Sequence, residues 1–196
     1  MIRSLRIAVA EDETCMKKYL QETLTLLGYQ VVCLANSGRE LVEQCKAVRP
    51  DLVITDINLP EMDGLDAARE IYAFEPMPII IVTAFHDPEL IERAEDNHIL
   101  AYLVKPIKQQ DLEPAIVIAM RRFQEFKTLR QDTDNLRQAL EDRKLIERAK
   151  GILMRRSSLE EAEAFRRLQK LARDKNRKLV EIAQAVITME ETCSLT

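Results

Sequence analysis

The chain has 196 residues, of which 46% are hydrophobic and 32% are charged, so it is long enough for one large or two small globular domains. No apolar run approaches the roughly 20 residues of a membrane span, and the first residues lack the features of a secretory signal. The four cysteines have no metal-binding spacing, and we therefore expect a cytoplasmic protein with reduced thiols and no membrane partner.

Five short apolar runs come first, and each has the composition of a strand buried on both faces. They occupy residues 5–10, 30–34, 51–55, 78–82 and 99–104. Residues 14–27 carry apolar side chains at helical spacing and stop before Gly28, a residue suited to ending a helix. Further helices are expected after Ser37, after the turn-rich segment 59–64, from Asp87 and Pro88, and from Gln110 onward. This alternation predicts a five-stranded, doubly wound parallel α/β sheet.

Five polar residues lie at the C-terminal ends of these runs or one or two residues beyond them: Glu11, Asp12, Asp56, Thr83 and Lys105. In an open parallel sheet these ends gather at one edge, where ligands bind. Taken singly, an aspartate after a strand is more often a helix cap, and a lysine before proline is more often solvated. Five such residues in this order favour one site, in which Lys105 offers a mobile charge and Thr83 a hydroxyl to a phosphate.

Asp56 is the expected phosphoacceptor, because a carboxylate that attacks a phosphoryl group yields an acyl phosphate. The two anions repel each other, and Mg²⁺ offsets such repulsion while binding one or two carboxylates, phosphate oxygens and waters. We expect Asp12 and Asp56 to be these carboxylates. Glu11 would hold a metal-bound water, and the backbone carbonyl of Asn58 would be a further ligand.

The segments VAEDE, ITDINLPEMDG, IVTAF and AYLVKP resemble the receiver domain of bacterial two-component response regulators, over about residues 3–121. The resemblance implies a flavodoxin-like fold, a Mg²⁺ cofactor, and a phosphoryl group taken from a phosphohistidine on a partner sensor histidine kinase. It further implies that Thr83 moves toward the phosphate while Tyr102 turns inward; without it, Tyr102 would be assigned to the core. The Lys105–Pro106 bond resembles one that is cis in this family.

A helical pattern continues through residues 122–143, which we expect to form a helical linker. Its apolar positions fall at alternating steps of three and four between two arginines; the stripe is Phe126, Leu129, Thr133, Leu136 and Leu140, flanked by Arg122 and Arg143. It spans only about two and a half heptads. Two interpretations stay open: one helix packed on its own domain, or a short parallel coiled coil that joins two chains.

Charge is divided unevenly along the chain. Between Arg143 and Lys178 there are 13 basic and 5 acidic residues, a net charge of +8, whereas the rest has 16 basic and 28 acidic residues, a net charge of −12. A basic block of this size predicts an anionic partner, nucleic acid before membrane.

Two further amphipathic helices follow the linker. Ser158 and Glu161 match the capping box S-x-x-E, which predicts a helix start at this point. The apolar side of this helix is formed by Leu159, Ala162, Phe165, Leu168, Leu171 and Ala172, and Asn176 breaks the pattern before the next helix. Each helix is too short to be stable alone, so we expect a small three-helix bundle.

Three functions fit a basic bundle to different degrees. A DNA-binding helix-turn-helix needs a tight turn, and the connections RRSSLEE and DKNRK do not look like one. A protein-binding bundle fits the apolar stripes but leaves the charge unexplained. An RNA-binding bundle explains both, because basic side chains contact phosphates and a bundle can meet an unpaired loop. The protein is not expected to be an enzyme, since no histidine and no second carboxylate cluster follow residue 121.

The residues RKLIERAKGILM, followed by EAFRRLQKLARDKNRKLVEIA, resemble the ANTAR domain, a three-helix transcription-antitermination module. The resemblance implies binding to paired hairpins in a nascent leader RNA, which keeps a terminator stem from forming and so acts on RNA polymerase only indirectly. It places RNA contacts on Arg148, Lys150, Gly151, Phe165, Arg166, Lys170, Arg173 and Lys178. Read from the sequence alone, Phe165 fits a core position better than base stacking. Gly151 either weakens its helix or permits a close approach by another helix or by RNA.

We therefore expect a response regulator with a receiver domain at 1–121, a helical coiled-coil linker at 122–143, and an ANTAR RNA-binding domain at 129–191. Phosphorylation of Asp56 would favour a homodimer through the helical stripe, and a dimer would present two bundles to two RNA loops. A DNA-binding transcriptional regulator and a phospho-dependent protein-binding module are the alternatives.

Overall fold

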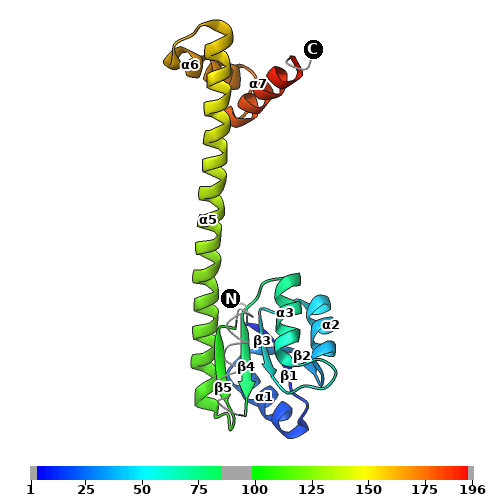
Figure 1. The fold of residues 1–196 in the computed structure, drawn as a ribbon. Helices are drawn as coiled ribbons and strands as arrows, with labels where there is room; N and C mark the ends of the chain where they lie inside the picture. Colours follow the sequence, from blue (N-terminus) through cyan, green and yellow to red (C-terminus); the bar gives the residue numbers. More distant parts are fainter. Residues whose placement is uncertain (1–3, 85–98, 194–196) are drawn as a thin grey trace. The chain divides into compact units, whose positions relative to one another are not determined.

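The computed structural model describes residues 4–84 and 99–193, and the chain divides into two compact units, Met1–Lys127 and Thr128–Thr196 (Figure 1). Each unit is described by itself. The helix expected to open at Asp87 and Pro88 lies outside the described residues.

The first unit is built on a five-stranded sheet in which all strands are parallel and follow the order β2-β1-β3-β4-β5. The strands are β1 Arg6–Ala10, β2 Gln30–Ala35, β3 Leu52–Asp56, β4 Ile79–Thr83 and β5 Ala101–Val104. Every residue of β3 and β4 is buried, as the apolar runs that begin both strands predict, and the polar last residues, Asp56 and Thr83, are buried with them. The predicted doubly wound α/β sheet is confirmed.

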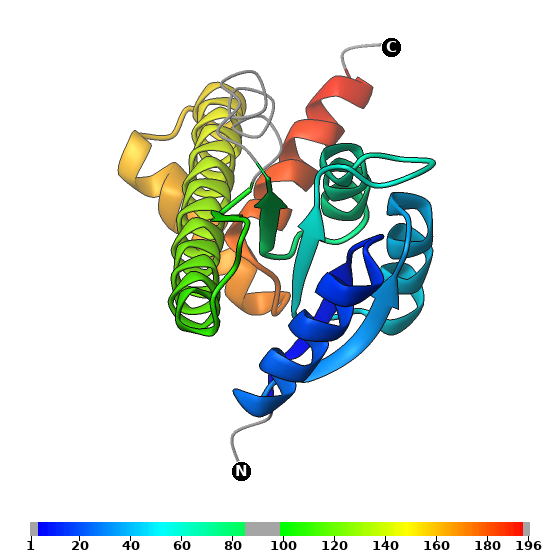
Figure 2. The same cartoon turned by 90° about the horizontal axis from the view of Figure 1, so that it is seen from below.

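Helices cover both faces of this sheet (Figure 2). One face packs against α2 Gly38–Val48 and α3 Gly64–Phe74, and the other against α1 Thr14–Leu26 and the beginning of α5 Gln109–Ser157. The local signals act as predicted: Gly28 has φ +86° just after α1, and the Ser37 hydroxyl accepts the N–H of Glu40 at the start of α2.

The second unit consists of the later part of α5 with α6 Glu161–Asp174 and α7 Leu179–Cys193. The three helices enclose a small core of Ala149, Ile152, Leu168, Ile182, Ala183 and Ile187. The three-helix bundle is thus as predicted, and the left-handed residue Asn176, with φ 50°, lies in the break between α6 and α7.

The capping-box prediction is wrong. Because α5 continues to Ser157, Ser158 takes a left-handed conformation, with φ 51°, in the turn that ends α5. The N-cap of α6 is Glu160, whose side chain makes no capping hydrogen bond. The buried side of α6 consequently begins at Ala164 rather than Leu159, and Ala162 is exposed.

The apolar stripe on the middle of α5 is exposed within the single chain. Leu129, Leu136 and Leu140 keep 66%, 67% and 59% of their surface accessible, and Phe126 keeps 39%. An exposed apolar stripe is what the coiled-coil interpretation requires, and the choice between the two interpretations stays a prediction.

From composition we expect no membrane span and reduced cysteine thiols. None of the helices in the described ranges is both long and apolar enough to cross a bilayer. Cys15, Cys33 and Cys45 are free thiols, the latter two buried.

Candidate functional site

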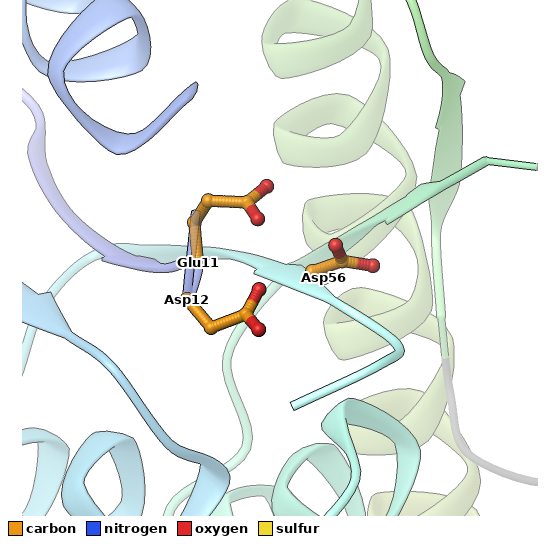
Figure 3. A group of neighbouring side chains, drawn as sticks. All are labelled: Glu11, Asp12 and Asp56. Atoms are coloured by element: carbon orange, nitrogen blue, oxygen red, sulfur yellow. The ribbon is translucent and has the colours of Figure 1, made fainter. Parts of the chain in front are cut away.

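Three acidic side chains meet at the C-terminal edge of the sheet (Figure 3). Glu11 and Asp12 directly follow β1, and Asp56 is the last residue of β3, the neighbouring strand. Their carboxylate oxygens lie within 4.8 Å of one another; Glu11 and Asp56 are buried, whereas Asp12 is exposed. This placement matches the prediction from strand ends and gives the cluster one side open to water.

Lys105 reaches into this cluster from the end of β5. Its ammonium lies 2.5 Å from Asp56 Oδ2 and 2.7 Å from Glu11 Oε2. Its backbone N–H donates to the carbonyl of Thr83 at 2.8 Å, which ties the ends of β4 and β5 together. The Lys105–Pro106 bond is cis, as the resemblance implies.

Burial and ion pairing act against each other at this site. Burial raises the pKa of Glu11 above its ordinary value of 4.5, and the charge of Asp56 adds to the rise, while Lys105 opposes it. For Lys105, burial alone would lower the pKa, but the hydrogen bonds to Asp56 and Glu11 outweigh it and raise the pKa above 10.5. The ammonium therefore stays charged across the physiological range and neutralises part of the acidic cluster.

The backbone around Asp56 is held by a close glycine contact. The N–H of Gly64 donates to the carbonyl of Ile57 at 2.8 Å, and a Cβ added to Gly64 would lie 1.9 Å from the carbonyl oxygen of Asp56. The start of α3 can approach β3 this closely only because residue 64 has no side chain. Sequence reasoning treated this glycine as part of a turn and missed its role; the Asp-Gly pair before the helix was the available signal.

Three further residues were predicted for the receiver site: Thr83, Asn58 and Tyr102. Thr83 is the last residue of β4 and is 9% exposed, two strands from Asp12. The N–H of Asn58 donates to Asp56 Oδ1 at 3.3 Å, and the role of its carbonyl as a metal ligand stays a prediction. Tyr102 is 39% exposed on β5, so the core position suggested by the sequence alone is wrong.

The acidic cluster has the donors that a hard divalent cation requires. Mg²⁺ binds carboxylate oxygens, and Glu11, Asp12 and Asp56 each offer one within a small volume. Glu11 is held in place by Lys105 and by the N–H of Glu13 at 3.3 Å. The residues present therefore fit the predicted cofactor.

In the second unit, Lys150 is buried between two of the chain's own carboxylates. Its ammonium lies 2.6 Å from Glu147 Oε2 and 2.7 Å from Glu161 Oε1, and the residue is 8% exposed. These two hydrogen bonds raise the pKa of Lys150 above its ordinary 10.5. Lys150, predicted to contact RNA, thus joins α5 to the start of α6.

The other RNA contacts predicted on α5 and at the start of α6 are Arg148, Gly151 and Phe165, and each has different surroundings. Arg148 pairs with Glu191 at 2.8 Å. A Cβ added to Gly151 would meet nothing within 4 Å, so within the described chain no helix makes the close approach that was considered. Phe165 is half-buried and lies outside the core of the bundle, which removes the core interpretation.

Three basic side chains form a stripe on the outer face of α6. Arg166, Lys170 and Arg173 follow one another at steps of four and three, opposite the buried Ala164 and Leu168. All three are exposed, and among the residues that the structure describes none of them has an ion-pair partner. We call these three residues the α6 stripe.

A hollow of about 430 Å³ lies at the end of this stripe, between α6 and α7. It is lined by Gln169, Ala172, Arg173, Asn176, Arg177 and Leu179. Two guanidinium groups and two side-chain amides give it the chemistry of a phosphate or base site. Of these residues, only Arg173 was among the predicted RNA contacts; Asn176 and Arg177 lie in the break after α6, which ends at Asp174, so no helical periodicity marks them.

Comparisons with known proteins agree with this geometry. Residues 7–117 match the family described as response regulator receiver domain, and residues 134–187 match the ANTAR domain. The transcriptional regulatory protein PdtaR of Mycobacterium tuberculosis is 42% identical over 93% of this chain and 89% of its own length. The chemotaxis protein CheY of Thermotoga maritima is 33% identical over 57% of this chain and 93% of its own.

Solved structures bear out the fold of the first unit. The signal receiver domain of a modulated diguanylate cyclase from Desulfovibrio desulfuricans G20 has a TM-score of 0.59 and 30% identity, covering 62% of this chain and 97% of that chain. The acidic cluster, the bridging lysine and the basic bundle thus occur together with both family matches, and the chain belongs to the response regulators that carry a receiver domain followed by an ANTAR domain.

Proposed function

We propose that a sensor histidine kinase phosphorylates this protein on Asp56 and that phosphorylation controls RNA binding by the second unit. Asp56 is the acceptor in this proposal, as the receiver family implies; it is buried and contacts Lys105, whereas Asp12 is exposed. In the transfer, a bond forms between an Asp56 oxygen and phosphorus as the bond from phosphorus to the histidine nitrogen breaks, and the imidazole leaves.

The residues around Asp56 have different roles in the phosphoryl transfer. Glu11, Asp12 and Asp56 would hold Mg²⁺, which would supply positive charge against the repulsion between Asp56 and the incoming phosphoryl group. Lys105 already contacts Asp56 at 2.5 Å, so its ammonium can pass to a phosphate oxygen with a small side-chain movement. Thr83, at the end of the adjacent strand, offers a hydroxyl to the same phosphate.

The α6 stripe is the observation that carries the proposal of RNA binding. Arg166, Lys170 and Arg173 present three cations on one face, whereas Lys150 and Arg148 are already paired within the chain. Cations without partners gain the most from binding phosphates, since no internal ion pair must be broken first. Lys178 extends this surface toward α7, and so does Arg177, which is paired with Glu181 at 3.8 Å.

Dimerisation through α5 links the two events in this proposal. The exposed stripe of Phe126, Leu129, Leu136 and Leu140 has heptad spacing, and a second copy of the chain supplies the matching stripe. A dimer carries two bundles, so two hairpins of one leader RNA bind with a gain from effective concentration. Holding both hairpins prevents a terminator stem from forming, and RNA polymerase continues without being contacted.

Two measurements test the proposal. Light scattering should show an increase from the mass of one chain to that of two when beryllofluoride or acetyl phosphate is added with Mg²⁺; an unchanged mass removes the link between phosphorylation and assembly. At about 150 mM salt, hairpin RNA should bind more tightly than duplex DNA of matched charge. Preference for the duplex would indicate a DNA-binding regulator, and absence of binding to both a protein-binding module.

A further inference from the structure

Glu11 and Asp12 are held in different ways, although they are adjacent and both side chains extend toward Asp56 (Figure 3). The Glu11 carboxylate contacts the Lys105 ammonium at 2.7 Å and accepts the N–H of Glu13 at 3.3 Å. In the part of the chain that the structure describes, no hydrogen bond or ion pair reaches the Asp12 carboxylate, which is exposed. The direction of the Asp12 side chain is therefore set by its backbone.

Lys17 holds this backbone from the first turn of α1. Its ammonium donates to the carbonyl of Glu11 at 3.2 Å. This carbonyl and the N–H of Asp12 belong to one planar peptide unit, so a bond to the carbonyl also fixes the plane from which Asp12 extends. The N–H of Glu11 donates to the carbonyl of Ala35 at 3.2 Å. The peptide units on both sides of Glu11 are thus bonded to other segments of the domain.

A second contact fixes the Lys17 ammonium itself. It also donates to the side-chain oxygen of Asn36, which lies in the turn between β2 and α2. The carboxylate of Glu40 accepts the backbone N–H of Asn36 at 2.7 Å and its side-chain N–H at 3.1 Å. These bonds hold the pKa of Glu40 below its ordinary 4.5, so Glu40 stays ionised at neutral pH and keeps the Asn36 oxygen turned toward Lys17. Lys17 therefore joins the turn after β1 to the turn after β2.

We propose that Lys17 is a positioning residue for the cation site, because it fixes the peptide between Glu11 and Asp12 with the Asp12 carboxylate facing the cluster. The assignment rests on the Mg²⁺ cofactor of the proposed function. Groups that orient the ligands of a metal raise its affinity without touching it. The positive charge of Lys17, taken alone, opposes the binding of a cation. Position and charge therefore predict opposite effects on Mg²⁺ affinity when the ammonium is removed.

The test is the Mg²⁺ affinity of the unphosphorylated full-length protein, measured by isothermal titration calorimetry. Lys17→Met keeps most of the side-chain length and removes the donor. It should weaken Mg²⁺ binding about 10-fold, the lower end of the loss for groups that orient metal ligands, because the lost positive charge offsets part of the effect. Lys18→Met is the matched control, since it removes the same charge from the next position of α1, where Lys18 is exposed and lies 3.7 Å from Glu22. It should bind Mg²⁺ at least as tightly as the wild type.

Two further variants separate positioning from charge and from folding. Asn36→Ala leaves every charge in place and removes the anchor of the Lys17 ammonium, so it should weaken Mg²⁺ binding by a smaller factor than Lys17→Met. Lys17→Arg restores a donor and should bind Mg²⁺ more tightly than Lys17→Met. Urea unfolding in EDTA checks that each variant is folded. A merely structural role would lower stability there and leave the Mg²⁺ affinity of the folded protein unchanged.

Two kinds of result would overturn the assignment, and they can be told apart. If the wild type binds Mg²⁺ and Lys17→Met binds it as tightly or more tightly, or if Lys18→Met loses as much affinity, Lys17 has no positioning role. In that case the Mg²⁺ cofactor of the proposed function stands. If the wild type itself binds no Mg²⁺ at millimolar concentrations, that cofactor fails, and the role of Lys17 fails with it.

Discussion

The Lys105 ammonium lies 2.5 Å from Asp56 Oδ2, although 49 positions separate the two residues in the chain. It also contacts Glu11, so one cation compensates two buried carboxylates. The unphosphorylated site is consequently held together by the side chain that the phosphate would later attract. This relationship makes the site sensitive to any change in its charge.

Replacing Lys105 with alanine should destabilise the receiver domain and increase its dependence on Mg²⁺. Without the ammonium, Glu11 and Asp56 face each other uncompensated, and we expect a loss of about 1–3 kcal/mol in the free energy of unfolding in EDTA. Mg²⁺ should restore a larger part of this stability in Lys105→Ala than it adds to the wild type. Urea unfolding with and without Mg²⁺ measures this; equal Mg²⁺ stabilisation of both proteins would contradict the assigned role.

Gly64→Ala tests the close packing of α3 against Asp56. The added methyl group would lie 1.9 Å from the Asp56 carbonyl oxygen, so the helix or the end of β3 must shift. We expect a destabilisation of about 1–3 kcal/mol, as for other overpacked positions, together with weaker Mg²⁺ binding. Gly151→Ala is the matched control, because its added methyl group meets nothing within 4 Å. It should leave the stability unchanged or raise it by about 1 kcal/mol through helix propensity.

The pH dependence of stability should report the burial of Glu11. Because burial raises its pKa above 4.5 in the folded state, the folded protein binds this proton more tightly than the unfolded chain does. The ionised form therefore opposes folding at neutral pH, and this cost disappears as the pH falls through the raised value toward 4.5. In EDTA, the stability of the wild type relative to Glu11→Gln should increase on acidification from pH 7 to pH 5. A decrease over the same range would show that the folded protein favours the ionised form.

The α6 stripe should determine how strongly RNA binding depends on salt. Each lost phosphate contact reduces the slope of log K against log salt concentration by about 0.7 for single-stranded RNA. Lys170→Gln should therefore lower the slope by about this amount, and the triple change of Arg166, Lys170 and Arg173 to Gln by about 2. Lys144→Gln is the control, since Lys144 is already paired with Glu141 at 2.7 Å. Equal effects of Lys170→Gln and Lys144→Gln would show that the stripe has no special role.

The receiver fold and its acidic pocket could be predicted because they depend on strand ends. Parallel strands bring their C-terminal residues to one edge, so positions such as Glu11, Asp56 and Lys105 could be assigned without knowing any side-chain contact. The close approach of Gly64 to Asp56 could not be predicted, because it depends on how deeply α3 packs. The apolar run alone would put Tyr102 in the core, and this is wrong because a strand at the edge of a sheet still exposes alternate side chains; its role as a switch residue stays a prediction.

In the bundle, periodicity identified the helices but not their ends or their ion pairs. The pattern at Ser158 matches a capping box, but the preceding helix extends to Ser157 and uses Ser158 in its own terminating turn. The sequence also gave no sign that Lys150 lies between Glu147 and Glu161, since Glu161 is eleven positions away on another helix. Contacts of this kind depend on the packing of α6 against α5.

The most direct test of the account is to capture and sequence the RNA that binds the full-length protein in a lysate of its own cells. The wild type treated with beryllofluoride and Mg²⁺ would be compared with the same protein untreated and with Asp56→Asn. The account predicts that only the treated wild type enriches leader RNAs with two adjacent hairpins upstream of a terminator. Enrichment of the same RNAs by all three samples, or of no hairpin pair by the treated wild type, would contradict it.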